Sequence, residues 1–104
     1  MAGVMSMDYG SFNSALNAAA GDDVVLASEL RLAFVESAER QLSLMTRSRC
    51  DANWEYSALR LKGVAASFGS SELIELAEAA IEGAPGDPVV LRKLGQAIER
   101  IRSN

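Results

Sequence analysis

The sequence contains no histidine, only one cysteine and only two prolines among its 104 residues. The absence of histidine removes the side chain that most often serves as a general base or a transition-metal ligand near neutral pH. The single cysteine, Cys50, excludes an internal disulfide and agrees with a reducing compartment. The sequence also lacks a glycine-rich phosphate-binding loop. We therefore expect neither a metal ion nor another cofactor.

Long apolar runs and an excess of positive charge are also missing. No run approaches the roughly 20 residues that cross a bilayer. A signal peptide would lack its basic segment, because the first basic residue is Arg31. The net charge of −4 argues against a nucleic-acid partner, because binding to phosphates usually depends on lysine and arginine. We expect a cytoplasmic protein that binds neither membrane nor nucleic acid.

The residues that are present favour one all-helical domain over 1–104. Hydrophobic residues make up 49% of the chain and charged residues 23%, which is typical of a globular protein. Alanine, leucine, glutamate and arginine, which lose little conformational freedom in a helix, are frequent. We expect a flexible N-terminus over residues 1–7, followed by an antiparallel, up-down four-helix bundle with a short additional N-terminal helix.

Apolar residues spaced three or four apart predict five helices. Gly21 and Gly69 are expected to end the first and third helices. The first helix is expected over about 8–19, the second from Asp22 or Asp23 to about residue 47, and the third over about 52–68. The fourth is expected to start at Ser70 or Ser71 and to end before the break at residues 83–88, and the fifth follows that break. The expected N-caps are Asp22 or Asp23, Asp51, Ser70 or Ser71, and Asp87. Pro88 follows the last of these caps in the first turn of its helix, where its missing N–H costs nothing.

The second and third of these helices each carry an apolar stripe that predicts the core. The predicted core residues of the second helix are Leu26, Leu30, Phe34, Ala38, Leu42 and Met45, and those of the third are Trp54, Ala58, Leu61, Ala65 and Phe68. Leu32 and Val35 lie away from the stripe of the second helix. We expect these two residues either to be solvated or to belong to a surface patch.

The opposite face of the third helix carries Glu55, Leu59, Lys62, Gly63 and Ala66. Leu59 lies about 200° around the helix from Leu61, so the two leucines cannot be equally buried. Leu59 is therefore covered by the first helix, an ordinary exposed apolar residue, or part of a binding surface. Gly63 costs about 1 kcal/mol relative to alanine in a helix. This glycine is either a close helix-packing contact or a gap that a partner approaches.

Residues 58–69 read Ala-Leu-Arg-Leu-Lys-Gly-Val-Ala-Ala-Ser-Phe-Gly. This segment resembles the signature of histidine-containing phosphotransfer (HPt) domains, Ala-His-X-Leu-Lys-Gly-Ser-Ala-X-X-Leu/Phe-Gly. Trp54 ahead of the motif and the Gly-Asp-Pro entry to the last helix fit the same family, so that the resemblance covers about residues 8–102. The matching positions are Leu61, Lys62, Gly63, Ala65, Phe68 and Gly69.

The sequence departs from the family at the position of the phosphorylated histidine, where it has Leu59. Leucine has no lone pair to accept a phosphoryl group, and no other histidine can replace it. Ser57, Ser67 and Ser70 lie near, but a serine phosphate ester is too stable to return its phosphate to an aspartate. Cys50 lies before the helix. We therefore expect no enzymatic activity and no retained phosphotransfer.

The resemblance implies a pseudo-phosphotransfer module that binds a response-regulator receiver domain or a histidine kinase. The expected contact residues are Leu59, Arg60, Lys62, Gly63 and Ala66, with Leu32 and Val35 as an extension of the patch. Arg47 and Arg49 are further candidate cations at its edge. The alternative is a helical homodimerisation or structural domain in which the same patch joins two copies. The first hypothesis predicts a monomer and the second a dimer.

Overall fold

The computed structural model describes the backbone of residues 3–103 and the side chains of residues 12–103, and this part of the chain is entirely helical between short connections. The helices are α1 (Gly3–Ala20), α2 (Val24–Thr46), α3 (Asp51–Ser67), α4 (Ser71–Glu82) and α5 (Pro88–Ser103). The predicted all-α class is confirmed. Helix α1 begins at residue 3, so it includes residues 3–7 of the segment expected to be flexible, whereas residues 1 and 2 lie outside the described residues.

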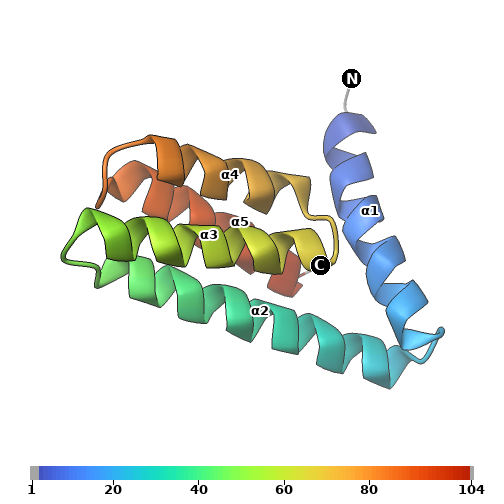
Figure 1. The fold of residues 1–104 in the computed structure, drawn as a ribbon. Helices are drawn as coiled ribbons and strands as arrows, with labels where there is room; N and C mark the ends of the chain where they lie inside the picture. Colours follow the sequence, from blue (N-terminus) through green and yellow to red (C-terminus); the bar gives the residue numbers. More distant parts are fainter. Residues whose placement is uncertain (1–2, 104) are drawn as a thin grey trace.

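Helices α2 to α5 lie side by side, and each runs in the direction opposite to the helix before it (Figure 1). In this arrangement α3 packs against α2 and α4, while α5 packs against α4 and α2. Helix α1 lies apart, across the end of the other helices where α2 begins, and its main contact is with α2. The result is a helical bundle with one additional helix at its end.

Two helix starts follow the predicted capping residues, and at α4 the N-cap is Ser70, whose side chain forms no capping hydrogen bond. The Asp23 carboxylate accepts hydrogen bonds from the amides of Val25 and Leu26, which fixes the start of α2. The Asp87 carboxylate accepts a bond from the Val89 amide at the start of α5. The prediction that Asp51 caps α3 is wrong. Asp51 is the first helical residue and Cys50 is the N-cap, so the Asp51 carboxylate stabilises the first turn through the helix dipole.

Two helix ends depend on left-handed backbone conformations. Gly69 has φ 67°, and it ends α3 with hydrogen bonds from its own amide to Ala66 and from the Ser70 amide to Ala65. Gly21 and Asp22 have φ values of 61° and 67° in the connection from α1 to α2. A non-glycine residue in this region costs about 1 kcal/mol, so Asp22 marks a sharply bent, mildly strained link.

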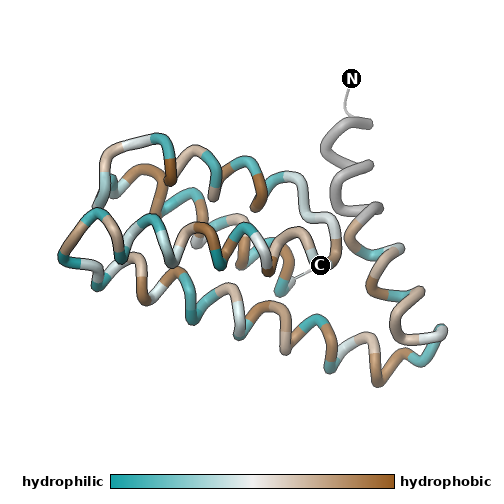
Figure 2. The backbone as a smooth tube through the Cα atoms, in the orientation of Figure 1, coloured by the Kyte–Doolittle hydropathy of each residue, from teal (hydrophilic) through white to brown (hydrophobic). Residues whose placement is uncertain are grey.

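The core is built from one apolar side of each of α2 to α5, together with Phe12 and Leu16 of α1. Both hydrophobic and hydrophilic residues occur along each of α2 to α5 (Figure 2). Trp54, Leu61, Leu73 and Leu94 are among its largest buried side chains. The indole N–H of Trp54 donates a hydrogen bond of 2.8 Å to the carbonyl of Ala80, which ties α3 to α4. The predicted stripe of α3 is confirmed for its first four residues, and Phe68 is partly buried.

The predicted stripe of α2 is partly wrong. Leu26 is 39% exposed because the first turns of α2 project beyond the neighbouring end of α3 (Figure 1). Val35, expected away from the core, is fully buried. Its burial follows from the position of α2 between α3 and α5, since a helix with two packed flanks buries a wider arc than a single stripe.

Candidate functional site

The face of α3 that points away from the core carries several exposed apolar residues. Leu59 is 50% exposed and Tyr56, one turn earlier, is 60% exposed. Gly63 and Ala66 continue the same side of the helix and are exposed as well. The two leucines of the motif therefore divide as helix geometry requires, with Leu61 fully buried and Leu59 at the surface. At 50% exposure, Leu59 is not buried beneath the described residues of α1.

Gly63 lies in open space. A Cβ atom added to this glycine would meet no heavy atom within 4 Å. The interpretation of Gly63 as a close contact between packed helices is therefore wrong. Since glycine costs about 1 kcal/mol relative to alanine inside a helix, the fold itself would be better served by alanine at this position.

A shallow groove runs between α2 and α3 beside Gly63. Its lining consists of Leu30, Ala33, Phe34 and Ser37 from α2, and of Gly63, Val64, Ser67 and Phe68 from α3. Phe34 is buried, and Leu30, Val64 and Phe68 are partly buried against the core, so they form the apolar floor. The remaining four are small residues, which leave the floor accessible.

Ala33 and Ser37 were not among the predicted site residues. They lie four residues apart on α2 and therefore on one side of that helix, opposite Gly63 in the groove. A pair of small residues at this spacing beside an apolar stripe was the only available signal. Without knowing how α2 and α3 are rotated toward each other, that signal could not be connected with Gly63.

The two motif cations, Arg60 and Lys62, differ in their partners. The ammonium of Lys62 forms a 3.0 Å ion pair with Glu78 of α4, so this cation is turned away from the groove. The guanidinium of Arg60 lies 5.6 Å from the centre of the Tyr56 ring and donates a 3.1 Å hydrogen bond to the Tyr56 hydroxyl. Among the described residues Arg60 forms no ion pair, so its charge is available to an acidic partner.

Leu32 does not lie in the groove beside Gly63. It lines a separate hollow between α2 and α5, together with Ser28, Arg31, Val35 and Arg102. Leu32 is 50% exposed there, whereas Val35 is fully buried. The expectation that these two residues extend the patch around Leu59 is therefore wrong, because they lie on the α5 side of α2 and the groove lies on its α3 side.

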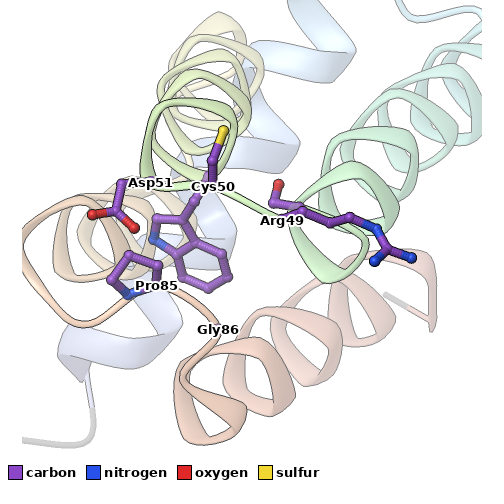
Figure 3. A pocket seen from close by; sticks show the side chains of 7 residues that line it. Arg49, Cys50, Asp51, Pro85 and Gly86 are labelled. Atoms are coloured by element: carbon purple, nitrogen blue, oxygen red, sulfur yellow. The ribbon is translucent and has the colours of Figure 1, made fainter.

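Arg47 and Arg49 belong to the opposite end of α3 from the motif. Gly63 is 12 residues into a helix that begins at residue 51, which places it about 18 Å from the connection that carries Arg49. The hollow at this connection is lined by Ser48, Arg49, Cys50, Asp51, Trp54, Pro85 and Gly86. Arg49 lines one side of this hollow, and Figure 3 shows its guanidinium pointing away from Asp51 and Pro85.

The three serines near Leu59 are either buried or hydrogen-bonded within their own helix. Ser57 and Ser70 are buried, at 5% and 3% exposure. The Ser67 hydroxyl donates a hydrogen bond to the carbonyl of Val64 within its own helix. The described residues contain no group of three Cys, Asp or Glu side chains that could hold a metal ion. Within the same part of the chain, no helix is both long and apolar enough to cross a membrane.

The site is thus an apolar ridge on α3, formed by Tyr56, Leu59, Gly63 and Ala66, beside the groove between α2 and α3. Beside it lies Arg60, which has no ion-pair partner among the described residues, and the position of the family's histidine is occupied by Leu59. Such a surface can bind another protein. Searches among models of protein families, curated proteins and solved structures found no match to this chain.

Proposed function

We propose that the chain is a pseudo-phosphotransfer module that binds a response-regulator receiver domain, or a histidine kinase, without carrying phosphate. The proposal includes an HPt-like arrangement of α2 to α5 and a cytoplasmic location. The single observation that supports it best is the exposed Gly63. This glycine lowers helix stability and relieves no clash, so a partner that approaches the backbone of α3 accounts for it.

The charge of the surface supports an acidic partner. Receiver domains carry a cluster of acidic residues that bind a divalent metal. Arg60 lies on α3 one residue after Leu59 and has no carboxylate partner among the described residues, so it can meet such a cluster. Lys62 is a weaker candidate because Glu78 already neutralises it. Complementary charge of this kind mainly raises the association rate and orients the partner.

Leu59 replaces the imidazole of the family with an apolar contact. Half of the side chain is exposed, and burial under a partner removes this area from water at about 25 cal/mol per Å². A complex formed in this way holds the receiver without accepting its phosphoryl group. The module therefore acts as a competitor of true phosphotransfer domains or as a scaffold for receivers.

Binding measurements with receiver domains of the source organism test the proposal. Isothermal titration of the full chain should identify a receiver that binds, and Gly63→Gln should weaken that binding at least about tenfold by filling the gap on α3. Ala79→Gln is the matched control, because Ala79 is also an exposed small residue within a helix but lies on α4. Equal affinity of the two variants would contradict the assignment of the surface.

A gain-of-function experiment tests whether the residues around Leu59 still support phosphotransfer. Leu59→His restores an imidazole at the family's phosphoacceptor position. We expect this variant to accept phosphate from a phosphorylated receiver, with an acid-labile, base-stable product, while the unsubstituted chain remains unlabelled. Failure of the variant to be labelled by a receiver that binds it would show that the surroundings no longer support transfer.

A second candidate function, self-association, is favoured by a different observation. Val25 and Leu32 are seven residues apart on α2, and they are 68% and 50% exposed. They share one side of the helix and lie outside the groove between α2 and α3. Sedimentation equilibrium distinguishes the two functions. A monomer agrees with receiver binding, and a dimer that Leu32→Glu dissociates would favour self-association instead.

A further inference from the structure

One end of the groove between α2 and α3 lies against the middle of α1, at Phe12. Phe12 of α1 is buried, and its ring meets the rings of Phe34 and Phe68 edge to face, with centroid distances of 4.9 and 5.7 Å. Phe34 and Phe68 also line the groove. Phe34 and Phe68 therefore line the groove on one side and contact Phe12 of α1 on the other. We call this contact with Phe12 the seat of α1.

The described part of α1 is held by few side chains. Its buried residues are Phe12, Leu16 and Ala20, which are four residues apart and form a single stripe. The other attachment is Arg31 of α2, whose guanidinium donates hydrogen bonds to Asn13 Oδ1 at 2.5 Å and to the carbonyl of Ile101 at 2.8 Å.

Arg31 also lies 5.5 Å from the centre of the Phe12 ring. This one side chain therefore connects α1 with α2 and with the last turn of α5. Its partial burial lowers the pKa of the guanidinium, which nevertheless remains charged throughout the physiological range.

Most of the shared core comes from α2 to α5, and the described part of α1 adds Phe12 and Leu16 to it. Each of α2 to α5 contacts two of the other three helices, and their shared core includes Trp54, Leu61, Leu73 and Leu94. Helix α1 joins them through the bent link at Gly21 and Asp22, where both φ values are positive. The described part of α1 has one apolar stripe, one polar attachment and a bent link, so we expect α1 to open before the remaining core does.

We infer that α1 is a displaceable cover that controls the aromatic end of the groove between α2 and α3. This inference rests on the proposed function, because it assigns regulation to the same docking surface. When α1 leaves its seat, Phe34 and Phe68 become accessible and the groove lengthens. A partner that uses the lengthened groove binds the open form and competes with α1, so its apparent affinity falls with the fraction of molecules that are open.

Substitution of Arg31 in the full chain tests whether α1 can leave its seat. Arg31→Ala removes both hydrogen bonds to the neighbouring helices, and Asn13→Ala is a milder variant that removes only the bond to α1. Arg92→Ala, an exposed arginine of α5, is the matched control. We expect the amides of α1 to exchange hydrogen at least about tenfold faster in Arg31→Ala, with protection of α3 and α4 unchanged. We expect a smaller increase in Asn13→Ala and none in the control.

Two further measurements relate this opening to the groove. Binding of the apolar dye 8-anilinonaphthalene-1-sulfonate should increase in Arg31→Ala, and a receiver that binds the wild-type chain should bind the variant about five- to tenfold more tightly. Weaker receiver binding would contradict the inference that α1 covers the groove, but it would not contradict the proposed docking surface. Unchanged dye binding together with unchanged exchange of α1 would contradict the inference as well. If no receiver binds any variant, the proposed function fails, and the dye and exchange results still decide whether α1 opens.

Discussion

The two faces of α3 show how differently folding constrains residues that are one position apart in the chain. On the inner face, Ala58 and Leu61 are fully buried and Trp54 is 2% exposed. On the outer face, Leu59 is half exposed and Gly63 touches nothing that a methyl group would disturb. Packing accounts for the composition of the inner face. It does not account for the outer face, where a glycine and a large apolar residue each work against stability or solubility.

The largest expected effect is the contrast between the two leucines of the motif. Leu61→Ala should lower the free energy of unfolding by about 2–5 kcal/mol, because it removes a fully buried side chain and leaves a cavity. Leu59→Ala should change it by less than about 0.5 kcal/mol. Urea denaturation followed by circular dichroism measures both. Equal losses in the two variants would mean that Leu59 contributes to the core.

The next largest effect concerns the buried hydrogen bond that Trp54 donates from the inner face of α3. Trp54→Phe keeps an aromatic ring but removes the N–H that bonds the carbonyl of Ala80. We expect a loss of about 1–3 kcal/mol in the free energy of unfolding, because a buried carbonyl is left without its donor. The same denaturation experiment measures it, and a loss below about 0.5 kcal/mol would indicate that water replaces the indole.

Substitution of the outer-face glycine should have the opposite sign. Gly63→Ala should raise the free energy of unfolding by up to about 1 kcal/mol, because alanine favours the helix and its methyl group meets open space. Gly95→Ala is a matched comparison within α5, where the added Cβ would lie 3.8 Å from Leu42 Cδ2. A destabilised Gly63→Ala variant would show that this position is constrained by the fold after all.

The smallest effect should belong to the ion pair beside the motif. Lys62 and Glu78 have side chains that are 40% and 46% exposed, and solvent screens such a pair strongly. A double-mutant cycle with Lys62→Ala and Glu78→Ala should therefore give a coupling energy below about 0.5 kcal/mol. A coupling above about 1 kcal/mol would mean that the pair positions α4 against α3 rather than merely neutralising a charge.

Much of the fold could be predicted because helical periodicity and capping are local properties of the sequence. The helix ends at Gly69 and the starts at Asp23 and Asp87 follow from turn and cap chemistry alone. The errors at Leu26 and Val35 have a non-local cause. The number of neighbouring helices changes along the length of α2, and it decides how many sides of α2 are buried at each turn. A single apolar stripe of constant width cannot predict this change.

The site was predictable only where one helix decides the outcome. Rotation by 100° per residue places Leu59 and Gly63 opposite Leu61, and both are exposed, which is one of the alternatives that the sequence left open. Ala33, Ser37 and the direction of Leu32 depend instead on the rotation of α2 between its two neighbours. The pairing of Lys62 with Glu78 similarly required the position of α4.

The hydrogen bond from Trp54 to Ala80 has a practical consequence, because Trp54 is the only tryptophan in the chain. Its fluorescence reports on the junction of α3 with α4. A red shift of the emission therefore signals loss of the bundle itself, while movements confined to the first helix leave the spectrum unchanged.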